Sequence, residues 1–137
     1  MSAHESPDGT AAAPRALIAC TPNELHETGP RMLVDLLEDD GWEVDFCGST
    51  VSTQNVIAAI RAREPRFVGL SVALARHLEG AALMIAEIRE ALGPQAPPIV
   101  VGGNAFRDDP ERWRQVGADL YLEDAAAAVT ALRRYKA

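Results

Sequence analysis

The chain has 137 residues, of which 47% are hydrophobic and 24% are charged, so one domain can bury a hydrophobic core without disulfides or a structural metal. The formal net charge of −7 argues against direct binding to nucleic acid, which needs a basic face opposite the phosphates. No apolar run approaches the roughly 20 residues of a membrane-spanning helix, and no signal peptide is visible. These features predict a cytoplasmic globular protein that binds neither nucleic acid nor membranes directly.

The first segment and the cysteines add little chemistry. Residues 1–14 are small and polar and include proline and glycine, which is typical of a flexible tail, so the domain is expected over residues 15–137. Cys20 and Cys47 both lie in predicted strands, and no Cys-x-x-Cys or Cys/His cluster suggests zinc. We interpret them as buried thiols of a cytosolic protein.

Beyond residue 15, strand and helix patterns alternate. In chain order they predict a strand at 16–20, a helix at about 30–39, a strand at 42–47, a helix at 52–63, a strand at 67–72, a helix at 78–92, a strand at 99–101, a short helix at 109–116, a strand at 119–122 and a helix at 124–135. Met32 is expected in the apolar stripe of the first helix. Either Ser52 or Thr53 is expected to cap the second helix, and Asp124 is expected to cap the last one.

Five βα units define a fold class. Right-handed crossovers place helices on both faces of a parallel sheet, and five such strands usually take the order 2-1-3-4-5. The sequence therefore predicts an α/β fold with a doubly wound sheet. Ligands bind such sheets outside the carboxyl ends of the strands, where the order reverses, here between the first and third strands.

His26 lies in the loop that follows the first predicted strand. A neutral imidazole can bind a transition metal through one nitrogen, while its other N–H needs an acceptor that fixes the tautomer. Glu24 is a plausible acceptor, and Gly29 leaves room for the close approach of a ligand. Each residue has an ordinary alternative, respectively a surface histidine, a solvated carboxylate and a glycine before a helix.

Two further segments face the same crevice. Ser71 ends the third predicted strand, so its hydroxyl is expected to point into the crevice. Gly102 and Gly103 directly follow the fourth strand and remove side chains from a crevice wall, although a tight turn would also explain them.

Three motifs together resemble the signatures of cobalamin (vitamin B12)-binding domains: Glu24-x-His26-x-x-Gly29, Ser71-Val72-Ala73 and Gly102-Gly103. The family patterns are Asp/Glu-x-His-x-x-Gly, Ser-x-Leu and Gly-Gly, in the same order, and the resemblance covers about residues 15–135. This chain departs from them with glutamate in place of the more usual aspartate and with Ala73 in place of leucine. Both changes could loosen the packing of the cofactor's benzimidazole or alter the basicity of His26.

The resemblance implies a flavodoxin-like fold and a defined binding mode. The dimethylbenzimidazole of the cofactor leaves cobalt, and its nucleotide tail enters the crevice between the first and third strands. His26 would replace it as the lower axial ligand of the metal, and Glu24 would hold the imidazole. The remaining contacts would come from Ser71 at the benzimidazole, from Ala73, from the two glycines where the tail passes, and from Ser49, Thr50 and Val51 at the lower face of the corrin.

The form Glu-x-His-Glu-x-Gly and residues 117–124, which include Tyr121 as an expected cofactor contact, are similar to light-responsive bacterial regulators. That similarity implies adenosylcobalamin, cleavage of its cobalt–carbon bond by light and a change of assembly; some relatives add a bilin such as biliverdin. Because 137 residues leave no space for the regulators' DNA-binding domain and four-helix bundle, we expect a standalone photoreceptor without enzymatic activity. It would self-associate as a dimer or tetramer or signal to a protein partner.

Two residues and two other functions complete these expectations. His77 lies six residues after Ser71, where cobalamin-dependent methionine synthases have a serine, so it is expected near His26 or the corrin edge. Arg76 is a candidate partner of a cofactor carboxamide or a bilin propionate. A surface histidine and a solvated arginine are the alternatives.

The alternative functions are the small cobalamin-binding subunit of a carbon-skeleton mutase and, after it, a corrinoid methyl carrier.

Overall fold

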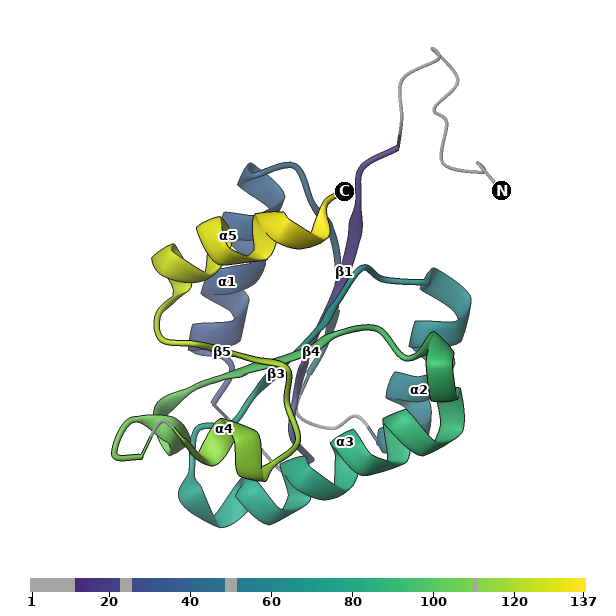
Figure 1. The fold of residues 1–137 in the computed structure, drawn as a ribbon. Helices are drawn as coiled ribbons and strands as arrows, with labels where there is room; N and C mark the ends of the chain where they lie inside the picture. Colours follow the sequence, from purple (N-terminus) through teal and green to yellow (C-terminus); the bar gives the residue numbers. More distant parts are fainter. Residues whose placement is uncertain (1–11, 23–25, 49–51, 110) are drawn as a thin grey trace.

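Strands and helices alternate along the chain in a computed structural model that describes residues 12–22, 26–48, 52–109 and 111–137 (Figure 1). The strands are β1 (Arg15–Cys20), β2 (Glu43–Cys47), β3 (Val68–Ser71), β4 (Ile99–Gly102) and β5 (Leu120–Leu122). The α-helices are α1 (Thr28–Asp39), α2 (Thr53–Arg63), α3 (Leu78–Leu92), α4 (Arg112–Gln115) and α5 (Ala125–Leu132). Short 3₁₀ helices include η1 (Ala75–His77), η3 (Asn104–Phe106) and η4 (Arg133–Tyr135).

The sheet is parallel throughout, and its strand order is β2-β1-β3-β4-β5. This order confirms the predicted doubly wound, flavodoxin-like topology. The direction of winding reverses between β1 and β3, where Cys20 pairs with Ser71. Ser71 in turn pairs with Gly102 of β4, so two of the three predicted signatures meet in one row at the carboxyl edge.

Helices cover both faces of the sheet (Figure 1). On one face, α1 and α5 lie side by side, and Leu37 and Leu132 are fully buried against Ile18 and Val100. On the other face, α2 and α3 pack over Leu17, Val68, Leu70 and Val101 through residues that include Ile57 and Ile88. Alternate residues of each strand therefore serve different helix pairs.

Most predicted boundaries agree with the structure to within about two residues, and both predicted caps are present. The Ser52 hydroxyl accepts a hydrogen bond from Asn55 N at 3.1 Å, and the Asp124 carboxylate accepts one from Ala127 N at 2.8 Å. The prediction for Met32 was wrong. Its side chain is 54% exposed, because the stripe that packs on the sheet runs through Leu37, whereas Met32 faces a groove described below.

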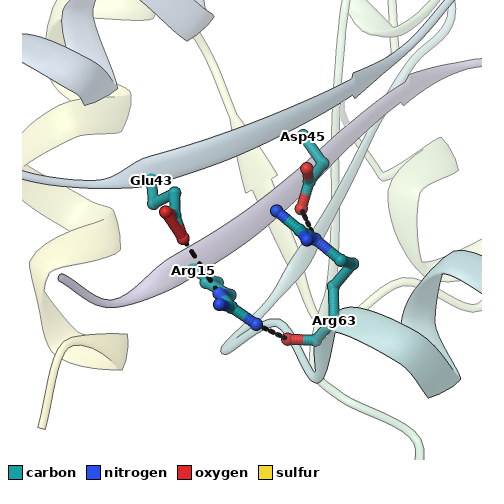
Figure 2. A network of polar contacts seen from close by, with 4 residues as sticks. All are labelled: Arg15, Glu43, Asp45 and Arg63. Carbon is teal, nitrogen blue, oxygen red and sulfur yellow. Dashed lines mark hydrogen bonds and ion pairs between the residues drawn. The ribbon is translucent and has the colours of Figure 1, made fainter. Parts of the chain in front are cut away.

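Polar contacts protect the edge strand β2 on its α2 side (Figure 2). Arg15 Nε lies 2.9 Å from Glu43 Oε2, and Arg63 Nε lies 3.0 Å from Asp45 Oδ2. Charged side chains along an edge strand oppose pairing with another chain. Cys20 is buried as predicted, whereas Cys47 on β2 is only half-buried, and burial together with Asp45 raises the pKa of its thiol.

The proposed tail lies largely outside the described residues, which begin at residue 12. Within the part of the chain that the structure describes, no helix has the length and apolar character needed to cross a membrane.

Candidate functional site

An open groove of about 280 Å³ lies at the carboxyl end of the sheet, between α1 and α5. Its walls come from the start of α1, with Gly29, Pro30, Met32 and Leu33, and from α5, with Ala125 and Ala128. Its floor is the sheet itself. An apolar, concave site with few polar groups is typical of a pocket for a small organic ligand.

The groove is deep because several strand positions in its floor carry a small side chain or none. Gly69, Ser71 and Gly102 all line it, and the strand register brings Ser71 beside Gly102. A Cβ at Gly69 would lie 2.8 Å from Cδ1 of Ile18, and one at Gly102 would lie 3.1 Å from the carbonyl oxygen of Leu122. Larger residues here would fill the groove, so its depth depends on these small side chains.

Gly103 has a different role. Its φ of +117° places it in a conformation that side chains rarely adopt, and a Cβ there would lie 2.3 Å from the carbonyl oxygen of Val72. The same carbonyl accepts a hydrogen bond from Ala105 N at 3.1 Å. Gly103 is therefore required by the close contact between the loop after β4 and the end of β3.

The loop after Gly103 is held firmly and ends at the mouth of the groove. Phe106 is fully buried, and its backbone N–H donates to Gly103 O at 3.2 Å. Arg107 follows it, and its N–H donates to Asn104 O at 3.1 Å. Arg107 lines the groove mouth together with Glu123 and Asp124.

His26 lies just before α1 and is exposed. The first turn of α1, which contains Gly29 and Pro30, lines the groove, so the imidazole belongs to the same edge of the molecule as the groove. Glu24 and residues 49–51 lie outside the described residues, so the predicted Glu24–His26 pair and the roles of Ser49, Thr50 and Val51 stay predictions.

The structure gathers some predicted residues and places others elsewhere. Gly29, Ser71, Gly102 and Gly103 all line the groove. The connection from β3 to α3 carries the half-buried Ala73 and His77 and the exposed Arg76, none of which lines the groove.

Tyr121 lies on the opposite face of the sheet from the groove. Its ring packs on Phe106 with ring centroids 5.6 Å apart, beside the cluster under α2 and α3. Burial is the main cause that raises the pKa of its hydroxyl, with Glu123 adding to it. Tyr121 does not line the groove, to which β5 contributes Leu122. It lines a second cavity together with Arg107, Glu123 and Asp124, so its predicted contact with the cofactor stays a prediction.

Several groove residues were not identified as site residues from the sequence, among them Gly69 and Arg107. Gly69 was considered only as part of a strand, although an isolated glycine in a strand indicates a close approach of another group. Arg107 was not considered, because arginines are common on surfaces and no motif includes it. Its position four residues beyond Gly103 was the available signal.

His26 is the one predicted metal ligand at this edge of the sheet, and a single imidazole fits a metal whose other ligands come from a cofactor. Among the residues that the structure describes, no group of three or more His, Cys, Asp or Glu side chains is arranged to hold a metal ion. A single imidazole would suffice for a metal already bound in a macrocycle. Thr21, next to β1, is fully buried, and no described residue accepts from or donates to its hydroxyl.

Comparison with known proteins identifies a family. The model of the B12 binding domain matches residues 14–133. The HTH-type transcriptional repressor CarH of Myxococcus xanthus is 35% identical over 91 residues, which are 66% of this chain and 30% of the repressor. CarA of the same organism is 32% identical over 118 residues, 86% of this chain and 40% of that protein. The chain thus spans less than half of either repressor.

A second kind of relative matches at lower identity. Dimethylamine corrinoid protein 3 of Methanosarcina mazei is 26% identical over 127 residues, which cover 90% of this chain and 74% of that protein. Among solved structures, a cobalamin-binding protein from Desulfitobacterium hafniense superposes with a TM-score of 0.82 at 22% identity, over 90% of this chain and 59% of that chain. At this identity the structural likeness supports the fold alone.

Proposed function

Because the chain belongs to the B12-binding domain family, we propose that it binds cobalamin with the nucleotide tail in the groove between α1 and α5. His26 is then the lower axial ligand of cobalt. The observation that carries this proposal is the floor of the groove, where Gly69, Ser71 and Gly102 replace the larger side chains expected under two helices. A planar aromatic base fits a narrow apolar space of this kind.

Different residues are proposed to contact different parts of the cofactor. Gly69 and Gly102 leave space for the base, and Ser71 offers the groove a hydroxyl that can donate or accept one hydrogen bond. His26 offers one imidazole nitrogen at the same edge, and Glu24 is proposed to accept from the other. Among the described residues, no group of three or more His, Cys, Asp or Glu side chains could hold a metal ion by itself, and a cobalt ion bound here would take its other ligands from the corrin.

The test is the identity of the axial nitrogen. Protein labelled with ¹⁵N only at histidine, loaded with cobalamin and reduced to Co(II), should show the two-line superhyperfine EPR pattern of a ¹⁵N nucleus. Unlabelled protein should show three lines from ¹⁴N. His26→Ala should abolish the ¹⁵N coupling. Retention of the ¹⁵N doublet in that variant would assign the ligand to another histidine and overturn the role of His26.

We propose further that the cofactor is adenosylcobalamin and that the chain responds to light. Support comes from the resemblance of residues 24–29 and 117–124 to light-responsive regulators and from more than 30% identity to two transcriptional repressors. When bound, adenosylcobalamin supplies a cobalt–carbon bond that light breaks. Self-association, a protein partner and a bilin as second chromophore belong to the same proposal.

Illumination tests this finer proposal. Adenosylcobalamin-loaded protein should change its absorption spectrum under green light and change its elution volume on a sizing column. Methylcobalamin-loaded protein kept in the dark is the control. Identical spectra and elution before and after illumination would reject light sensing and leave cobalamin binding intact.

A corrinoid carrier is the second candidate, and the match to dimethylamine corrinoid protein 3 over 90% of this chain favours it. A carrier should accept or release a methyl group on its bound corrinoid when a partner methyltransferase is added in the dark. Light should not be required for that exchange.

A further inference from the structure

Two of the chain's arginines differ from all the others. Each of the other arginines uses its guanidinium in a hydrogen bond or ion pair with a carboxylate or a carbonyl oxygen. Arg76 and Arg107 make no such contact with any described residue. Both lie at the carboxyl edge of the sheet, on connections that follow β3 and β4.

Of these two, only Arg107 lines the groove. It stands at the mouth, whereas Arg76 belongs to η1 on the connection to α3. In a chain with a net charge of −7, an unpaired guanidinium at the entrance of a cavity offers all of its donors to an anionic ligand.

Carboxylates share the mouth with Arg107, and they do not pair with it. Asp124 caps α5 by accepting from Ala127 N at 2.8 Å. Glu123 is exposed and also lines the groove. Since neither carboxylate makes an ion pair with Arg107 among the described contacts, a ligand anion would not have to break one.

The backbone below Arg107 fixes where the guanidinium is presented. Gly103 connects β4 to η3 and packs closely on the backbone of Val72. The fully buried Phe106 fixes the end of this loop. Arg112 adds a hydrogen bond from Nη1 to Ala105 O at 3.1 Å. A rigid base lowers the entropy that binding would otherwise cost.

We propose that Arg107 binds the phosphodiester of the cobalamin nucleotide tail, an inference that rests on the proposed function. The phosphodiester lies between the corrin ring and the benzimidazole along the covalent tail. When the base occupies the groove and the ring remains outside it, the phosphodiester must cross the mouth that Arg107 lines. Guanidinium and phosphate match in charge and in their paired hydrogen bonds.

This contact makes Arg107 a residue that selects corrinoids with a complete tail. Because the side chain is exposed, solvent screens the interaction, and its removal is expected to weaken cobalamin binding about fivefold. Cobinamide has the corrin ring and lacks the phosphate, ribose and base, so its affinity should not depend on Arg107.

The experiment measures dissociation constants by absorbance titration with aquocobalamin and with cobinamide. Arg107→Gln should lose about fivefold in affinity for cobalamin and nothing for cobinamide, and Arg107→Lys should recover part of the loss. Arg134→Gln is the matched control, because it removes the same charge from an exposed arginine that donates to Ala131 O. It should change neither constant.

The outcomes separate this inference from the proposed function. An Arg107→Gln variant that binds cobalamin as tightly as the wild type, or that loses affinity equally for both corrinoids, overturns the inference and leaves cobalamin binding in place. A wild-type chain that binds neither corrinoid overturns both.

Discussion

The two faces of the sheet are built from the same strands and serve different purposes. Under α2 and α3, strand positions hold Leu17, Val68, Leu70, Ile99 and Val101, all buried in a continuous cluster. Under α1 and α5, the intervening positions hold Gly69, Ser71 and Gly102 near the carboxyl edge. The first face is filled along its whole length by its own side chains. The second is filled by residues such as Ile18, Phe67 and Val100 and is open to a ligand only near the carboxyl edge.

The contrast shows how a small domain can bind a large cofactor without losing its core. Because side chains alternate between faces along each strand, one residue in two can be reduced to glycine or serine without creating a cavity on the other face. Stability should therefore respond to substitutions in the buried cluster of either face, and ligand affinity mainly to substitutions at the carboxyl edge of the α1/α5 face.

The largest effect on stability is expected on the filled face. Ile88 of α3 is fully buried, so Ile88→Ala should lower the free energy of unfolding by about 2–5 kcal/mol through lost burial and a residual cavity. Urea denaturation followed by circular dichroism measures the loss. Leu33→Ala, in the half-buried wall of the groove, is the companion variant and should cost less.

A substitution that fills the groove should have the opposite effect, with little change in stability and a large loss of affinity. In Gly69→Ala, the new methyl group would meet the movable end of Ile18, and the lower entropy of the unfolded chain offsets the crowding, so stability should change by less than about 1 kcal/mol. Corrinoid affinity should fall about tenfold or more, because even one methyl group reduces so narrow a space.

Gly80→Ala controls for the general effect of replacing a glycine. A Cβ at Gly80 of α3 would have open space around it, so this variant should be slightly more stable, by about 0.5–1 kcal/mol, with unchanged affinity. Equal affinities of the Gly69 variant and the wild type would remove Gly69 from the groove floor.

A smaller effect is expected from the ion pairs that join the two groove helices. Asp40 directly follows α1 and accepts hydrogen bonds from Arg133 of η4, whose Nη2 lies 2.8 Å from Oδ1. Lys136 Nζ lies 3.2 Å from Oδ2. The Arg133 hydrogen bond is the main cause that lowers the pKa of Asp40 from 3.8 to about 2.

The sign of the pH dependence follows from that shift. A lowered folded-state pKa stabilises the fold above pH 4, and this stabilisation is lost as the pH falls towards 2. Asp40→Asn should therefore unfold at lower urea than the wild type at pH 7, and the difference should shrink towards pH 2. A difference that stayed constant over this range would contradict the role of the charge.

The smallest effect should come from the surface contacts in Figure 2. Arg63→Gln removes the contact with Asp45 on the edge strand β2, where both side chains are partly exposed and salt screens them. We expect a slight decrease in the urea midpoint at low salt that disappears at high salt. Corrinoid affinity should stay the same, since this network lies on the filled side of the sheet.

Sequence patterns predicted the strand order and most boundaries, because apolar runs and caps such as Ser52 and Asp124 report local structure directly. They predicted only part of the groove. Met32 was assigned to the core because periodicity marks an apolar stripe without showing where the underlying sheet is missing side chains. Tyr121 was predicted as a cofactor contact from similarity alone. Its register with Val101 turns its ring away from the groove floor, and that contact stays a prediction.

Gly103, which follows β4, and Gly69, which lies in β3, are under separate constraints. Gly103 is required by a positive φ and by its contact with Val72 O, whether or not a cofactor is present. A Cβ at Gly69 would be too close only to Cδ1 of Ile18, a side-chain end that can move, so the fold constrains position 69 less strictly than position 103. In related domains that no longer bind vitamin B12, position 103 should still be glycine, whereas position 69 should accept other residues. Comparing the two positions among relatives would therefore distinguish loss of the cofactor from loss of the fold.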